Sequence, residues 1–218
     1  MRWLGTALYA EGPTDSRFLQ PLLQRACAQM CLTECTAPVE VSDVLDLQPL
    51  PDTHGQSRGQ RIVAAALEAR DAWSILFIHA DADGDQGRAI QERVEPARTL
   101  LQAEWGAHSV AVVPVRMTEA WVLADFQALK SSFGTTMSEQ ELGLADAVAH
   151  GPDRLTDPKA TLEAAFRASL GKRRSRSVAT YFGLIGETAS FVELRKLDAY
   201  RRMEAELRQA LRTLGYFN

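Results

Sequence analysis

Acidic residues follow two apolar segments of the sequence, and their spacing suits metal chemistry. Glu11 comes directly after the apolar run near the start of the chain, and Asp81 and Asp83 follow the run SILFIHA. If both runs are parallel strands, their carboxyl ends meet at one edge of the sheet, and we expect the three carboxylates to converge there. Clustered carboxylates repel one another, and a hard cation such as Mg²⁺ or Mn²⁺ relieves that repulsion. The pattern therefore predicts a metal site that stabilises phosphoryl charge and activates water.

The elements that must position these residues alternate between strand and helix over the first 130 residues. Apolar runs with strand character lie at 3–10, 39–47, 74–80 and 109–115. Helices are expected at 14–35, capped by Thr14 or Asp15, and at 62–70, 86–105 and 117–129. The run at 74–80 is apolar almost throughout, which is typical of a strand buried on both faces. This alternation predicts an α/β fold with a four-stranded, mainly parallel sheet flanked by helices.

The pattern changes near Lys130, after which the sequence has no strong strand signal. Three helices are expected there, at 138–149, 157–170 and 197–214, and the first opens with the capping-box spacing of Ser138 and Glu141. We therefore expect a metal-binding α/β domain over residues 1–130 and a helical C-terminal extension, packed on it, over residues 131–218.

Composition places the chain among ordinary globular proteins, because 46% of its 218 residues are hydrophobic and 24% are charged. No apolar run approaches the roughly 20 residues that span a bilayer, and no leader segment is evident, so a cytoplasmic protein without a membrane partner is expected. The three cysteines, Cys27, Cys31 and Cys35, share one helix face at four-residue spacing. The first and last are too far apart to share one zinc ion, so we interpret them as core residues.

Two acidic motifs resemble those of the TOPRIM (topoisomerase–primase) fold: YAEGPTD around Glu11 and FIHADADGD around Asp81. The later VPVRMTEAWVLAD, the Asp157-Pro158-Lys159 segment and the closing FVELRKLDAYRRMEAELRQAL are similar to stand-alone TOPRIM-like proteins of bacteria. The resemblance covers most of the chain and implies a TOPRIM-like sheet. By position, Glu11 resembles the TOPRIM glutamate, while Asp81 and Asp83 resemble its Asp-x-Asp metal ligands.

The resemblance extends to OLD-family nucleases, and it implies further site residues. In those enzymes additional acidic groups hold a second metal ion. Glu119 and Asp85 are the first candidates for that role here, and Asp15 and Asp125 are the second choice. Those nucleases also use a lysine near the scissile phosphate. Lys159 matches that lysine by position, and Lys172 competes with it.

The function that the motifs and the resemblance imply is a phosphoryl-transfer enzyme that depends on Mg²⁺ or Mn²⁺. We expect a nuclease of a phage-defence or mobile-element system, and we expect DNA rather than RNA as its nucleic-acid substrate. The ATPase domain of OLD proteins is missing from this sequence, which implies a separately encoded ABC-type ATPase partner. The alternative is a non-catalytic TOPRIM-like subunit that binds an ATPase or nucleic acid, and a homodimer is left open.

A basic segment adds a candidate nucleic-acid contact, formed by Lys172, Arg173, Arg174 and Arg176. The net charge of −4 hides a division of the chain. Residues 1–166 carry 13 basic and 23 acidic side chains, a net charge of −10, whereas residues 167–218 carry 11 and 5, a net charge of +6. An acidic metal-binding part beside a basic tail fits a phosphate backbone as ligand.

Two other interpretations of the aspartate-rich stretch fail on position. A calcium-binding EF-hand loop needs glycine where Gln86 stands, and it follows a helix rather than a strand. Haloacid-dehalogenase phosphatases carry their Asp-x-Asp on the first strand, with Thr or Val where Asp85 stands here. His79 shares the strand face of Phe77 and Ile75, so we interpret it as a core or supporting histidine rather than a catalytic base.

Overall fold

A computed structural model of the chain describes residues 2–51, 55–170 and 177–217. Its centre is a four-stranded sheet in the order β2-β1-β3-β4, and all of its strand pairs are parallel. The strands are β1 (Arg2–Tyr9), β2 (Val39–Asp46), β3 (Ile75–His79) and β4 (His108–Val112). The predicted α/β fold, with a four-stranded parallel sheet flanked by helices, is confirmed. β4 ends at Val112, three residues before the predicted end.

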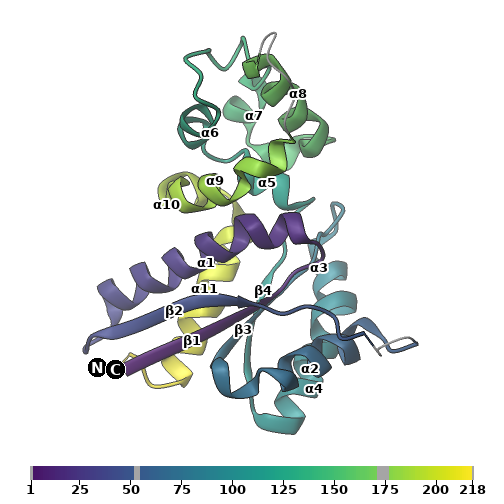
Figure 1. Cartoon of the computed structure of the whole chain (residues 1–218), viewed down its shortest axis with the longest axis vertical. Helices are drawn as coiled ribbons and strands as arrows, with labels where there is room; N and C mark the ends of the chain where they lie inside the picture. The colour runs from purple at the N-terminus through teal and green to yellow at the C-terminus, as the bar shows by residue number, and fades with distance from the viewer. Residues whose placement is uncertain (1, 52–54, 171–176, 218) are drawn as a thin grey trace.

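Helices cover both faces of the sheet (Figure 1). One face packs against α1 (Pro13–Glu34) and α11 (Asp198–Thr213), and the other against α2 (Arg58–Glu68) and α4 (Glu95–Trp105). Because side chains alternate along a strand, Phe77 of β3 joins the first core and Ile78 joins the second. Every residue of β3 is buried, as its apolar run predicted.

The first connection places α1 directly behind β1. Gly12 is the N-cap, and Pro13 occupies the first turn. Proline has no backbone N–H, which costs nothing there because the N–H groups of the first turn have no acceptor within the helix. The predicted cap at Thr14 or Asp15 is therefore wrong by two or three residues, and Asp15 lies inside the first turn instead. Pro21 lies within α1 without ending it. Cys27 and Cys31 are buried in the core, which confirms their interpretation as core residues.

The connection between β3 and β4 changes its helical geometry along its length. It contains α3 (Gln86–Ala89), then a π-helical segment, η2 (Ile90–Val94), and then α4, with Pro96 in the first turn. The expected helix over 86–105 thus changes its type along its length and is not interrupted at Pro96. Segments of π-helix are frequent at functional sites, and this one carries Arg93.

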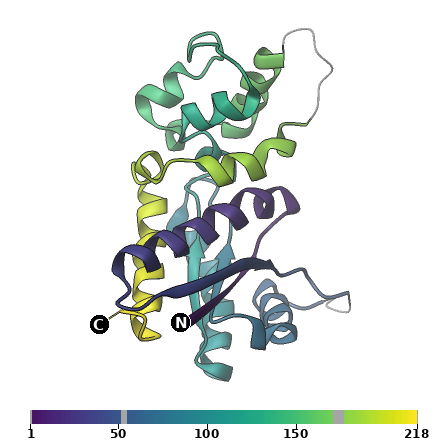
Figure 2. The ribbon, with the colours of Figure 1, turned by 60° about the vertical axis from the view of Figure 1, so that its left-hand side comes forward.

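Short helices lie above the carboxyl edge of the sheet, and α11 then runs back along the sheet (Figures 1 and 2). They are α5 (Thr118–Val122), α6 (Phe126–Phe133), α7 (Ala145–His150), η3 (Pro152–Arg154), α8 (Pro158–Leu170), η4 (Val178–Tyr181), α9 (Phe182–Thr188) and α10 (Phe191–Leu194). The predicted division near residue 130 falls inside α6 and stays a prediction. Among the described helices, none has the length and apolarity to cross a membrane.

Two helix predictions in this region are wrong in detail. The expected helix over 117–129 is divided into α5 and α6, because Asp125 accepts backbone N–H groups and caps α6. The expected helix over 138–149 is helical only at Ala145–His150. Ser138 and Glu141 do make the reciprocal capping contacts, but they close a turn instead of starting a helix.

Helix α9 crosses α1 at a close approach that only glycine permits. A Cβ atom at Gly186 would lie 2.3 Å from the Phe18 carbonyl oxygen and 2.9 Å from Pro21 Cγ. Gly186→Ala is therefore expected to lower the free energy of unfolding by about 1–3 kcal/mol, although alanine favours helix. Urea unfolding followed by circular dichroism measures this loss.

The matched control is Gly183→Ala in the same helix. Its added methyl group would lie 3.7 Å from the Arg17 carbonyl oxygen, an ordinary contact distance. This variant should be as stable as the wild type or slightly more stable. Equal losses in the two variants would contradict the steric explanation.

Candidate functional site

The carboxyl ends of β1 and β3 lie side by side, which brings Glu11 next to His79. The two strands pair in parallel with Tyr9 opposite Ile78, so the residues that follow meet at the same edge. The Glu11 backbone N–H donates a hydrogen bond to His79 Nδ1 at 3.3 Å. Asp81 continues from β3 into the same region, so Glu11 and Asp81 meet at the sheet edge where the sequence pattern places them.

His79 is fully buried, and its contacts define its role. Because Nδ1 accepts the Glu11 N–H, the proton of the neutral ring lies on Nε2. Nε2 is 3.0 Å from Thr118 Oγ1 and 3.3 Å from Asp81 Oδ1. Thr118 also donates its backbone N–H to Asp81 Oδ1 at 3.2 Å. His79 and Thr118 therefore orient the Asp81 carboxylate, in line with the interpretation of His79 as a supporting residue.

Three side chains come close enough to hold one cation. Asp15, His79 and Asp81 each offer a ligand atom, and these atoms all lie within 4.8 Å of one another. Asp15 comes from the first turn of α1, so the start of that helix places it over the end of β3. The Asp15 and Asp81 carboxylates are oxygen donors that suit divalent metals, whereas both ring nitrogens of His79 are already engaged by Glu11, Thr118 and Asp81.

Glu119 of α5 belongs to the same acidic group. Burial raises the pKa of its carboxyl, and the negative charges of Asp15 and Asp81 raise it further. The Lys159 ammonium group, at the start of α8, acts in the opposite direction. Asp15, Asp81 and Glu119 thus form a crowded carboxylate cluster, with the charge of Lys159 close enough to act on it.

Glu11 and Asp83 instead face arginine side chains. Glu11 Oε1 lies 3.3 Å from Arg58 Nη1 and 3.4 Å from Arg93 Nη1. Asp83 Oδ2 lies 3.4 Å from Arg93 Nη2, and its side chain is 69% exposed. The backbone of Asp83 adopts a left-handed φ of 51° in the turn after β3. Of the three predicted ligands, Glu11 and Asp83 therefore lie against positive guanidinium groups, whereas Asp81 lies among negative carboxylates.

Two of the other acidic candidates serve as helix caps. Asp85 is the N-cap of α3 and accepts the Arg88 N–H at 3.0 Å. Asp125 is buried and accepts backbone N–H groups from Gln127, Ala128 and Ser190 at 2.8–3.1 Å. Because its two oxygens are already occupied, Asp125 holds α6 and the start of α10 in place.

The predicted phosphate contacts of the basic segment, Lys172, Arg173, Arg174 and Arg176, lie outside the described residues. The same holds for Lys172 as the competitor of Lys159. Among the lysine candidates, Lys159 is therefore the one that the structure describes, and it is exposed.

A family model described as "Domain of unknown function (DUF4276)" matches residues 10–196. The chain belongs to the DUF4276 family. The matched region starts one residue before Glu11 and includes every candidate site residue up to Lys159. Comparison with curated proteins and with solved structures gave no match. The DUF4276 description names no activity, so the resemblance to TOPRIM proteins and OLD-family nucleases stays a prediction.

Sequence reasoning missed two functional candidates in the DUF4276 region, Arg58 and Arg93. Arg58 opens α2, which follows a loop rich in turn residues, and Arg93 lies in the π-helical segment. Their link to Glu11 spans 47 and 82 residues, so no local spacing reveals it. The available signal was positional, because α2 begins at the carboxyl edge of a parallel sheet, where ligands bind.

The raised pKa of Glu119 predicts that this side chain destabilises the metal-free DUF4276 protein near neutral pH. Above the ordinary glutamate pKa of 4.5, the native state binds more protons than the unfolded state until the raised native pKa is passed. Over that interval the free energy of unfolding falls as the pH rises. Glu119→Gln removes this effect, so in EDTA the variant should be more stable than the wild type at pH 7. The advantage should shrink as the pH falls towards 4.5.

Urea unfolding across the range from mildly acidic to neutral pH measures this difference. Glu68→Gln, an exposed change on α2, is the control for loss of one negative charge. A Glu119→Gln variant less stable than that control at every pH would contradict the prediction.

Proposed function

We propose that this protein is a phosphoryl-transfer enzyme that uses Mg²⁺ or Mn²⁺ to hydrolyse phosphodiester bonds of nucleic acid. The observation that carries the proposal is the convergence of Asp15, His79 and Asp81, whose ligand atoms lie within 4.8 Å of one another. Glu119 extends the cluster, since burial raises the pKa of its carboxyl and the negative charges of Asp15 and Asp81 raise it further. A divalent cation relieves that charge, so the donor set fits the metal.

The protein's own groups have separate tasks in this proposal. Asp81 presents its carboxylate in an orientation held by the Thr118 N–H and by His79. Asp15, and Glu119 beside it, would supply further oxygen ligands, and Lys159 brings positive charge towards the same place. The bound cation would stabilise phosphoryl charge and lower the pKa of a water molecule.

The wider biological setting belongs to the same proposal. It comprises DNA as the preferred substrate over RNA, a phage-defence or mobile-element system, a cytoplasmic location and a separately encoded ABC-type ATPase. These parts rest on the resemblance to TOPRIM and OLD-family proteins and on the basic composition of residues 167–218.

One observation favours a second candidate function, a non-catalytic subunit. Glu11 and Asp83, two of the predicted ligands, contact Arg58 and Arg93, so a cation at those two carboxylates would have to compete with guanidinium groups. Under this alternative, cleavage appears only when an ATPase partner is present.

The decisive experiment combines a cleavage assay with a measurement of cation binding. The purified chain is incubated with supercoiled plasmid, linear DNA or RNA in Mg²⁺, Mn²⁺ or EDTA, and melting is followed in the same buffers. We expect nicking or degradation only with the cation, together with a higher Tm, because a ligand that binds the native state stabilises it. Cleavage that survives EDTA would refute the proposal, and a Tm rise without cleavage would favour the non-catalytic subunit.

A further inference from the structure

Two arginine side chains meet at Glu11 beside the carboxylate cluster, and the charge of a third arginine acts on them. Arg58 and Arg61 are three residues apart at the start of α2, and Arg93 approaches from η2. Burial lowers the pKa of the Arg58 guanidinium, Glu11 opposes this effect, and the positive charges of Arg93 and Arg61 lower it further. We call Arg58, Arg61 and Arg93 the arginine cluster.

Backbone carbonyl groups hold two of these guanidinium groups in place. Arg58 Nη2 donates to the His79 carbonyl at 2.6 Å, and Arg58 Nε donates to the Arg93 carbonyl at 3.3 Å. Arg93 Nη1 donates to the Asp81 carbonyl at 2.9 Å. A carbonyl group carries no net charge, so these bonds orient the guanidinium groups without neutralising them.

The carboxylates in contact with the arginine cluster neutralise it incompletely. Arg58 and Arg93 share a single oxygen of Glu11, and the contacts of 3.3–3.4 Å exceed the roughly 2.7–2.9 Å typical of strong charged hydrogen bonds. Asp83 is mostly exposed. Within the described part of the chain, Arg61 has no ion-pair partner and its buried Nε has no hydrogen-bond partner. Among the described residues, the arginine cluster thus carries three positive charges and has two carboxylates in ion-pair contact with it, those of Glu11 and Asp83.

We propose that the arginine cluster binds a phosphate group of the substrate and that the Glu11 carboxylate takes the place of that group in the free protein. The inference rests on the proposed function and names the residues that receive the substrate. A phosphodiester group offers two non-bridging oxygens that share one negative charge, and these match forked guanidinium donors better than one shared carboxylate oxygen does. Arg93 binds the Asp81 carbonyl, so the phosphate lies next to the cluster of Asp15, Asp81 and Glu119.

Binding is tested without metal, so that it does not depend on cleavage. Inorganic phosphate is titrated into the full chain in EDTA, and the arginine Nε–Hε signals are followed by NMR. We expect the signals of Arg58, Arg61 and Arg93 to shift together and to saturate. The signal of Arg88, an exposed arginine of α3 paired with Glu92, serves as the internal control. Shifts of Arg88 equal to those of the cluster would overturn the proposal.

Variants of the cluster test its contact with a polynucleotide. The probe is a labelled, short single-stranded DNA oligonucleotide in EDTA, titrated at several salt concentrations. Arg93→Met should weaken binding roughly tenfold, as loss of a charged hydrogen bond does. It should also reduce the slope of log K against log salt by about 0.7. Arg88→Met removes one exposed charge nearby and should change neither quantity comparably. Equal effects of the two variants would overturn the proposal.

A change at Glu11 gives a prediction of opposite sign. Glu11→Gln frees both guanidinium groups from their internal carboxylate and should strengthen binding of the DNA oligonucleotide by several-fold. Glu92→Gln removes an exposed carboxylate from the neighbouring surface and should strengthen it less. Weaker binding by Glu11→Gln, or an equal gain in both variants, would contradict the proposal even if an arginine variant misfolds.

The outcomes separate this inference from the proposed function. Phosphate binding at the arginine cluster without any cation-dependent cleavage supports the anion site and refutes the enzyme. Cation-dependent cleavage that Arg93→Met leaves unchanged supports the enzyme and overturns the assignment of the arginine cluster.

Discussion

Replacing Asp81 with asparagine is expected to lower cation-dependent cleavage of nucleic acid by at least about a hundredfold. Groups that merely orient a metal ligand already change affinity or activity by about 10- to 100-fold, so loss of a ligand carboxylate should do at least as much. Asparagine keeps an oxygen for the Thr118 N–H and for His79, so the local fold should persist. Initial rates of plasmid nicking at saturating Mn²⁺ provide the measurement.

Cation binding should change in parallel with activity. The wild-type Tm should rise on addition of Mn²⁺, whereas the Tm of Asp81→Asn should change little. In EDTA the variant should be at least as stable as the wild type, because it removes one charge from a crowded acidic cluster.

The matched control is Asp71→Asn. This aspartate is 95% exposed and lies in η1 (Arg70–Ala72), before the start of β3. The cleavage rate of the Asp71→Asn variant and the rise of its Tm with Mn²⁺ should both equal those of the wild type. An Asp81→Asn enzyme with undiminished, EDTA-resistant cleavage would remove the basis of the proposed metal centre.

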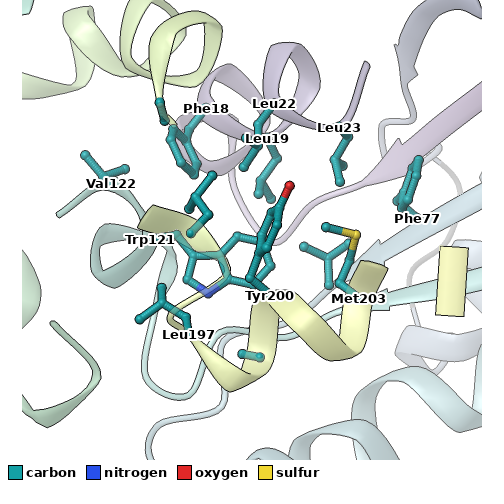
Figure 3. Packing of buried hydrophobic residues seen from close by; sticks show 14 of the residues in the cluster. Phe18, Leu19, Leu22, Leu23, Phe77, Trp121, Val122, Leu197, Tyr200 and Met203 are labelled. Carbon is teal, nitrogen blue, oxygen red and sulfur yellow. The ribbon is translucent and has the colours of Figure 1, made fainter. Parts of the chain in front are cut away.

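Replacing Trp121 with alanine is expected to lower the free energy of unfolding by about 3–5 kcal/mol, the range for large aromatic residues of a core. Trp121 is fully buried in α5, where its ring meets Tyr200 of α11 edge to face at 5.3 Å (Figure 3). Phe18 of α1 belongs to the same core cluster. The substitution therefore opens a cavity where the short helices, α1 and α11 meet, and equilibrium unfolding in urea measures its effect.

Trp121→Phe separates loss of the ring from loss of the indole N–H. The Trp121 Nε1 atom is buried without a hydrogen-bond partner among the described residues, so its removal leaves no partner unpaired. Phenylalanine retains an aromatic face for Tyr200, and the loss should be well below that of alanine. If both variants lose the same free energy, the cavity explanation is wrong.

Much of the sheet could be predicted from the sequence because its signals are local. The run 74–80 is apolar almost throughout because β3 is buried on both faces, between α1 and α11 on one side and α2 and α4 on the other. The helices that follow the sheet were harder to predict. Asp125 ends one helix and begins another because its carboxylate binds three backbone N–H groups, one of them on Ser190, 65 residues away.

The candidate site shows the same division. The sequence by itself determined that Glu11 and Asp81 would share an edge, because the carboxyl ends of parallel neighbouring strands meet there. Only the tertiary structure decided which charge each carboxylate meets. Helix α1 brings Asp15 to Asp81, while α2 and η2 direct Arg58 and Arg93 to Glu11. Those contacts join segments far apart in the chain. They are set by the packing of helices on the sheet, and no local spacing in the sequence reveals them.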